Sequence, residues 1–153
     1  MIELSNILLL SSTGVLGVFL GAQIAEACLF VPIWKKMNPD DFFEQHKSVG
    51  PLIYRFFAPI TIAATVIPLV TVAVNLFFNA EQLILILILG VSTLIFFSTY
   101  FLYFKDANQK FSDRSLTNEE LPSELVKWES WHWFRIVFEA IAFLSALIML
   151  LIR

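Results

Sequence analysis

The sequence predicts an all-α integral membrane protein, a four-helix bundle with a short amphipathic helix between spans one and two. Three observations lead to this prediction. The chain of 153 residues is 58% hydrophobic and 15% charged, whereas soluble domains are about 45–50% apolar and about 25% charged. The mean hydropathy is +0.78. Four separate segments are each long and apolar enough to cross a bilayer as a helix, which takes about 20 residues.

The predicted spans make residues 1–153 a single transmembrane domain, and they cover residues 7–33, 58–78, 83–104 and 131–152. The first span is not expected to be a cleaved signal peptide, because it lacks a basic n-region and a small-residue cleavage site. Only residues 79–82 connect spans two and three, which predicts a tight antiparallel turn. Pro59 lies close to the start of span two, and Pro68 lies inside it and should kink it.

The connection between the first two spans has the pattern of a short amphipathic helix. Residues 38–41 read Asn-Pro-Asp-Asp, with a capping Asn, Pro at the first position and acids at the positive end of the helix dipole. Apolar residues then follow at helical spacing. We expect Gly50-Pro51 to end this helix, which would lie at the membrane interface. A second helix start, Leu-Pro-Ser-Glu, occupies residues 121–124 of the polar third connection.

Basic residues gather in the first and third connections: Lys35, Lys36, Lys47 and Arg55, then Lys105, Lys110, Arg114 and Lys127. Cytoplasmic loops are enriched in Lys and Arg, so both connections are predicted to be cytoplasmic and both termini non-cytoplasmic. The expected location is a bacterial inner (plasma) membrane, with the lipid bilayer as a partner. The net charge of −3 argues against nucleic acid as a partner.

The last span carries one polar face with the residues Trp128, His132, Arg135 and Glu139. Their spacing places them on a single side of the helix, and the opposite side carries Phe134, Val137, Ile141 and Leu144. Ionisable residues in a membrane face a bundle interior or a watery cavity and find partners. The polar face is therefore predicted to point inward, with Arg135 balanced by Glu139 and by Glu26 of the first span.

Other spans supply polar residues at the same cytoplasmic end. Gln23 and Glu26 lie in the first span, and a rise of about 1.5 Å per residue places Glu26 roughly 12 Å inside the boundary. Tyr100 and Tyr103 lie in the third span. These residues predict a polar pocket in the cytoplasmic half of the bundle. A purely structural network that holds the helices in register explains the same residues.

A different face of the first span carries only small residues: Gly14, Gly17, Gly21, Ala25 and Cys28. Such a face lets another helix approach closely, either within the bundle or between chains, so a homo-oligomer is an open alternative. The single Cys28 excludes an intrachain disulfide and a Cys-based zinc site.

Several chemistries lack their sequence motifs. The chain has no glycine-rich phosphate loop, no nucleophile elbow and no His-Glu-x-x-His motif. It also lacks the paired Glu-x-x-His motifs of a ferritin-like diiron bundle, since Glu129 and His132 have this spacing only once. No metal site is predicted, and a metal or haem site at His46 and His132 is the alternative. The simpler interpretation of His46 is a surface residue of the amphipathic helix.

The segment Trp-x-x-Trp-His-x-x-Arg at 128–135, which enters the last hydrophobic helix, resembles the four-helix membrane proteins of the anthrone oxygenase-like family, a domain-of-unknown-function family. The glycine-rich region 14–21 with Pro32, the segment Arg-Phe-Phe-Ala-Pro at 55–59 and the segment Ala-Asn-Gln-Lys-Phe at 107–111 agree with it. The resemblance covers nearly the whole chain. The family often has a second Asn four residues before Asn108, where this chain has Phe104.

The resemblance implies oxidation of a planar, phenolic anthrone to an anthraquinone by molecular oxygen, without a bound organic cofactor. His132 or Glu26 would act as the base and Arg135 would stabilise the anion, with Glu139 as its counter-charge. Substrate-binding candidates are Trp128, Trp131, Tyr100, Tyr103, Asn108 and Gln23. The predicted function is thus a membrane-embedded oxygenase or oxidoreductase for a hydrophobic aromatic small molecule. The alternative is a non-catalytic membrane subunit or binding protein whose buried polar network is structural, with haem or a metal as one option for what it binds.

Overall fold

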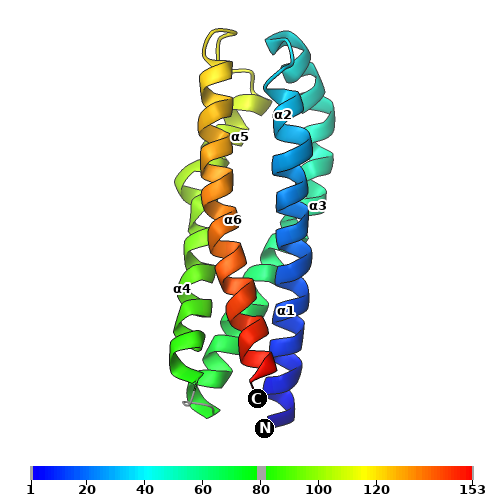
Figure 1. Cartoon of the computed structure of the whole chain (residues 1–153). Coiled ribbons are helices and arrows are strands. Elements are labelled where there is room, and N and C mark those ends of the chain that lie inside the picture. Colours follow the sequence, from blue (N-terminus) through cyan, green and yellow to red (C-terminus); the bar gives the residue numbers. More distant parts are fainter. Residues whose placement is uncertain (1, 79–81, 153) are drawn as a thin grey trace.

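The structure, a computed structural model, describes residues 2–78 and 82–152. Within these residues, four helical columns are long and apolar enough to span a membrane, and they stand side by side along one axis (Figure 1). This confirms the all-α four-helix membrane bundle. The elements, in chain order and with η for a π-helix, are α1 (Ile2–Ala25), η1 (Glu26–Phe30), α2 (Val31–Trp34), α3 (Pro39–Phe78), α4 (Leu83–Thr99), η3 (Tyr100–Phe104), α5 (Lys105–Ser112) and α6 (Leu121–Leu151).

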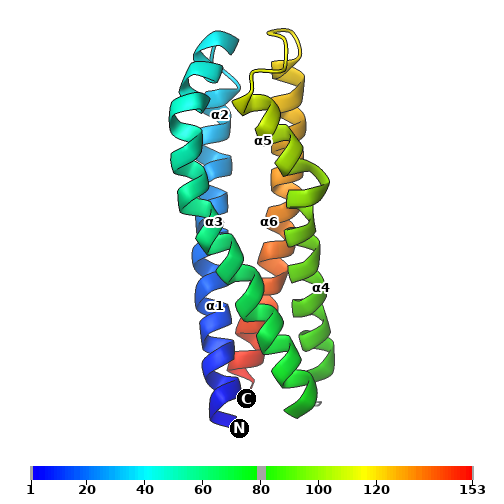
Figure 2. The ribbon, with the colours of Figure 1, turned by 180° about the vertical axis from the view of Figure 1, so that it is seen from behind.

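The second column differs from the prediction. A helix does begin at Pro39, and the Asp40 backbone N–H donates to Oδ1 of Asn38 at 3.0 Å, as the start signal indicates. The predicted break at Gly50-Pro51 is wrong, because α3 runs on to Phe78 with three prolines inside it. A proline removes one backbone hydrogen bond and bends a helix that packing holds in place. Figure 2 shows α3 changing direction near its middle, so that its lower half crosses toward α4.

The third and fourth columns are longer than the predicted spans. Residues 105–112, expected in a polar connection, form the helix α5 directly after η3. The helix α6 begins at Leu121, where the second start signal lies. Residues 79–81 of the predicted tight turn lie outside the described residues.

The start of α1 and the end of α6 lie at the same end of the bundle (Figure 1), as an even number of spans requires. The prediction that this end is non-cytoplasmic stays a prediction. The outward face of α6 is confirmed, because its four apolar residues are 37–53% exposed. The small-residue face of α1 also points mostly outward: within it, Gly14, Gly21 and Cys28 are exposed, and Gly17 lies against Phe143 of α6.

The interior has two apolar clusters at different levels. One occupies the half of the bundle that carries the termini and includes Leu9, Leu16 and Met149. The other is aromatic, lies at the opposite end and includes Phe42 and Phe111. The polar residues predicted for α1 and α6 lie between the two clusters in both columns, so the apolar packing leaves them enclosed within the bundle.

Candidate functional site

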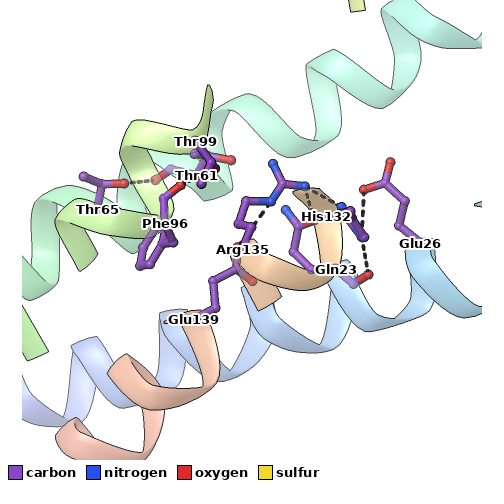
Figure 3. Close-up of polar contacts among 9 residues, drawn as sticks. All are labelled: Gln23, Glu26, Thr61, Thr65, Phe96, Thr99, His132, Arg135 and Glu139. Atoms are coloured by element: carbon purple, nitrogen blue, oxygen red, sulfur yellow. Dashed lines mark hydrogen bonds and ion pairs between the residues drawn. The ribbon is translucent and has the colours of Figure 1, made fainter. Parts of the chain in front are cut away.

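Five side chains from two columns form a buried group that we call the polar cluster: Gln23, Glu26, His132, Arg135 and Glu139 (Figure 3). The first two come from the end of α1 and the start of η1, and the other three come from one face of α6. The structure thus brings together the polar residues that the sequence placed on two separate spans.

Arg135 is the centre of this cluster. Its Nη2 donates to Oε1 of Gln23 at 2.6 Å and to Nδ1 of His132 at 2.8 Å. Its Nε lies 3.7 Å from Oε1 of Glu139, one helical turn away, which confirms the predicted pair. The guanidinium lies over the ring of Phe104, 4.2 Å from its centre, within the range of a cation–π interaction. Among the described residues, none of these contacts uses Nη1.

The two ring nitrogens of His132 are both engaged. Nδ1 must accept from Arg135, because a guanidinium can only donate. Nε2 lies 2.9 Å from the backbone oxygen of Gln23, which can only accept, so Nε2 carries the hydrogen. This pattern assigns His132 as the neutral Nε2–H tautomer. Glu26 lies 3.9 Å from Nε2, too far for a hydrogen bond, and a neutral imidazole forms no ion pair with it.

The two carboxylates of the cluster are placed differently. Glu139 is 0% exposed, and neither of its oxygens has a hydrogen-bond partner in the described part of the chain. Its one ion-pair partner in the described ranges is the guanidinium of Arg135. Glu26 instead faces a cavity. Glu26 is therefore positioned to meet a ligand, whereas Glu139 acts as a counter-charge behind Arg135.

The cavity has a volume of about 670 Å³, within the range of about 300–1,000 Å³ that is usual for small-molecule sites. All four columns contribute to its lining. Gln23, Glu26 and Arg135 supply polar groups to one part of the wall. Most of the remaining wall is aromatic, with Phe19, Trp34, Phe42, Phe57, Phe96, Phe97, Tyr100, Phe101, Phe104, Phe111 and Trp128.

Some of the predicted site residues line the cavity and others do not. Tyr100, Trp128 and Asn108 line it, and Nε1 of Trp128 donates to Oδ1 of Asn108 at 3.0 Å. His132 and Glu139 are not among the lining residues. Glu139 adjoins the cavity wall through Arg135, and His132 adjoins it through Arg135, Gln23 and the stacked ring of Trp128. Tyr103 and Trp131 pack on each other instead, with ring centres 5.3 Å apart and planes 8° from parallel.

Tyr103 has its hydroxyl group outside the cavity as well. This hydroxyl donates to Oε1 of Glu124 at 2.8 Å. The structure therefore gives Tyr103 and Trp131 a packing role between the third and fourth columns.

Several lining residues were not predicted. Phe104 supports the guanidinium of Arg135, while Phe57, Thr61 and Phe96 line the membrane-level part of the cavity. A Phe within an apolar span carries no signal that separates an inward position from a lipid-facing one. Only the packing of the bundle makes that distinction.

Two π-helices lie at the level of the polar cluster. η1 begins at Glu26 and η3 ends at Phe104, and each has two consecutive buried residues: Glu26 with Ala27, and Tyr103 with Phe104. π-helical turns are rare and occur often at functional sites. Here they place Glu26 at the cavity and Phe104 beneath Arg135.

The described residues around the cavity offer few side chains that could bind a metal ion. Among the described residues, no group of three or more His, Cys, Asp or Glu side chains could hold a metal ion. His46 lines the cavity and stacks on Phe42, with ring centres 5.5 Å apart. The nitrogens of His132 are occupied by Arg135 and Gln23, so they are not available as ligands in this arrangement.

In comparisons with protein-family models, with curated proteins and with solved structures, nothing matches this chain.

Proposed function

We propose that this protein is a membrane-embedded oxidoreductase that binds a hydrophobic, planar aromatic molecule and oxidises it with molecular oxygen. One observation carries the proposal. A cavity with aromatic walls has, on a single side, the carboxylate of Glu26 and the guanidinium of Arg135, whose Nη1 takes no part in the contacts to Gln23, His132 and Glu139. This pairing of a base with a cation suits a substrate that loses a proton and becomes an anion.

The reaction proposed is that of an anthrone, as the sequence resemblance implies. Glu26 takes a proton from the methylene carbon between the two rings, and the charge moves to the carbonyl oxygen, where Nη1 of Arg135 stabilises it. Oxygen then forms a bond to that carbon and gives a hydroperoxide, which loses water to leave a second carbonyl. One anthrone and one O₂ thus become one anthraquinone and one water. Four electrons pass from the carbon to oxygen.

His132 is a positioning residue in this scheme. Its Nδ1 accepts a hydrogen bond from Arg135 and its Nε2 bonds the α1 backbone. It therefore holds the guanidinium in place, and it offers no free lone pair for a proton from the substrate. Of the two bases considered from the sequence, Glu26 is the one that the geometry favours.

The test uses purified protein in lipid nanodiscs with an anthrone, and it follows oxygen uptake and the absorbance of the quinone. Glu26→Gln should lower the rate above spontaneous oxidation by about 10²–10⁴-fold, the usual contribution of a general base, with an unchanged melting temperature. The matched control is Glu129→Gln, whose carboxylate pairs with Lys35 outside the cavity. Equal rates for wild type and Glu26→Gln would contradict the proposal. Binding without any turnover would instead favour the non-catalytic binding protein.

A further inference from the structure

We infer that ligands enter the cavity sideways from the bilayer, through an opening between α3 and the column α4–η3–α5. The ligand is accordingly an uncharged aromatic amphiphile dissolved in the membrane. Its chemical class rests on the proposed function, whereas the route rests on the shape and surroundings of the cavity.

The position of the opening follows from which lining residues are exposed. Those from the first and fourth columns are buried or partly buried. Phe19 and Gln23 are at most 1% exposed, Trp128 is 5% exposed, and Trp34 and Arg135 are partly buried. Those from α3 and η3 include Tyr54 at 65% and Phe101 at 59%. The cavity therefore meets the outside between α3 and the third column. Figure 2 views the bundle from this side, with α3 and α5 in front of α1 and α6.

The opening faces lipid along much of its length. Ile62 and Phe101 both line it, are 60% and 59% exposed, and lie within apolar spans. Their neighbour Leu102, 70% exposed, continues the apolar border. Water does not wet such a border at the level of the hydrocarbon core. Toward α5, the cavity is also lined by Lys105, Gln109 and Ser112. A polar substituent of the ligand can stay hydrated at that end.

The end of the bundle beyond the cavity is closed by aromatic packing. Phe42 at the start of α3 meets Phe111 of α5 edge-on, with ring centres 5.2 Å apart. His46 packs against both rings, with its ring centre 5.5 Å from each. At the surface, an ion pair joins Arg114, in the turn after α5, to Asp40 at the start of α3. A ligand approaching along the bundle axis would have to separate these contacts, whereas a ligand in the bilayer would not.

The charges at the inner wall select against a free anion. Arg135 is the one cation of the polar cluster, and its charge is offset by Glu139 at 3.7 Å and by the nearby Glu26. The cluster therefore has no excess positive charge. It offers hydrogen-bond donors and acceptors to a neutral polar group, while the aromatic walls take a flat ring system.

The experiment measures access to a single cysteine in proteoliposomes, on a Cys28→Ser background. Thr61→Cys and, as a second position, Ala58→Cys place the thiol on the cavity wall. Each is labelled with a lipid-dissolved pyrene maleimide and with a membrane-impermeant sulfonated maleimide present on both sides. Rates are normalised to Ser115→Cys in the exposed connection. We expect the normalised rate to be at least about tenfold higher for the lipid-dissolved reagent, a difference of about 1.4 kcal/mol in barrier.

A blocking variant locates the route. Ile62→Trp adds bulk at the opening and should slow labelling by the pyrene reagent about tenfold. Val137→Trp, on the outer face of α6 away from the opening, is the control and should leave the rate unchanged. Equal normalised rates for the two reagents, no effect of Ile62→Trp, or no labelling by either reagent would each overturn the inference. No substrate is present, so a failed oxidase assay would leave this result standing.

Discussion

Replacing Arg135 by leucine tests the polar cluster most directly. The change removes the two hydrogen bonds to Gln23 and His132, at 2.6 and 2.8 Å, and the 3.7 Å ion pair with Glu139. It leaves Glu139 fully buried with no partner of opposite charge. Because Glu139 already lacks hydrogen bonds in the described part of the chain, no other contact compensates the loss.

The expected cost is about 3–5 kcal/mol of unfolding free energy, the usual effect of removing one partner from a buried ion pair. A hydrogen bond to a charged group contributes about 1.5–3 kcal/mol to stability. The contributions of the two lost hydrogen bonds are already part of the cost of breaking the ion pair, so they are not added to it. Replacing both Arg135 and Glu139 by leucine should be less harmful than Arg135→Leu alone. A buried pair exchanged for two apolar residues is often neutral or stabilising.

The assay is a double-mutant cycle, with unfolding in mixed micelles followed by circular dichroism. Phe134→Leu on the outer face of α6, 46% exposed, is the control and should stay within about 0.5 kcal/mol of wild type. A double variant that is no more stable than Arg135→Leu would contradict this prediction, because the unpaired carboxylate would then not be the source of the cost.

Two further predictions concern regions away from the cavity, and both use unfolding measurements. A Cβ atom at Gly17 would lie 3.1 Å from Cε2 of Phe143, whereas one at Gly14 meets nothing within 4 Å. Gly17→Val should therefore cost about 1–3 kcal/mol, and Gly14→Ala should be neutral or stabilising by up to about 1 kcal/mol; equal effects would contradict the packing. At the start of α6, the Thr117 backbone N–H donates to Glu120 and lowers the pKa of this carboxyl below its ordinary value of 4.5. A carboxyl whose pKa is lowered by folding stabilises the fold at higher pH, and this stabilisation is lost as the pH falls through the folded-state pKa. Glu120→Gln should therefore weaken the loss of stability below about pH 4.5. An unchanged dependence of stability on pH in this acid range would refute the prediction.

The helical class and the inward face of α6 could be predicted because lipid leaves few alternatives. A charge in the hydrocarbon core costs at least about 2.5–3.5 kcal/mol on insertion scales. Arg135 and Glu139 therefore had to face the interior, and their spacing fixed which side of α6 did so. The polar side chains of Gln23 and Glu26 likewise favour the bundle interior over lipid, and both are buried.

The path of α3 could not be predicted, because local signals and packing disagree there. Gly50-Pro51 is a typical helix break, yet Phe42 and Phe43 on the preceding turns are 1% and 3% exposed. Their burial beside Phe111 in the aromatic cluster holds the first part of α3 in line with the rest. The contribution of that packing depends on residues far away in the sequence.

The two π-turns coincide with side chains of the candidate site. Adjacent buried residues also occur in the regular helices, such as Phe42 with Phe43 in α3 and Ser92 with Thr93 in α4, so burial of two neighbours does not by itself require a π-turn. The wider π-turns bury Glu26 beside Ala27 and Phe104 beside Tyr103. Within η3, one ring can then stack on Trp131 while the other supports Arg135. Backbone groups in a membrane must be hydrogen-bonded within their own segment, and the helical π-turns meet this need while Glu26 faces the cavity and Phe104 lies beneath Arg135.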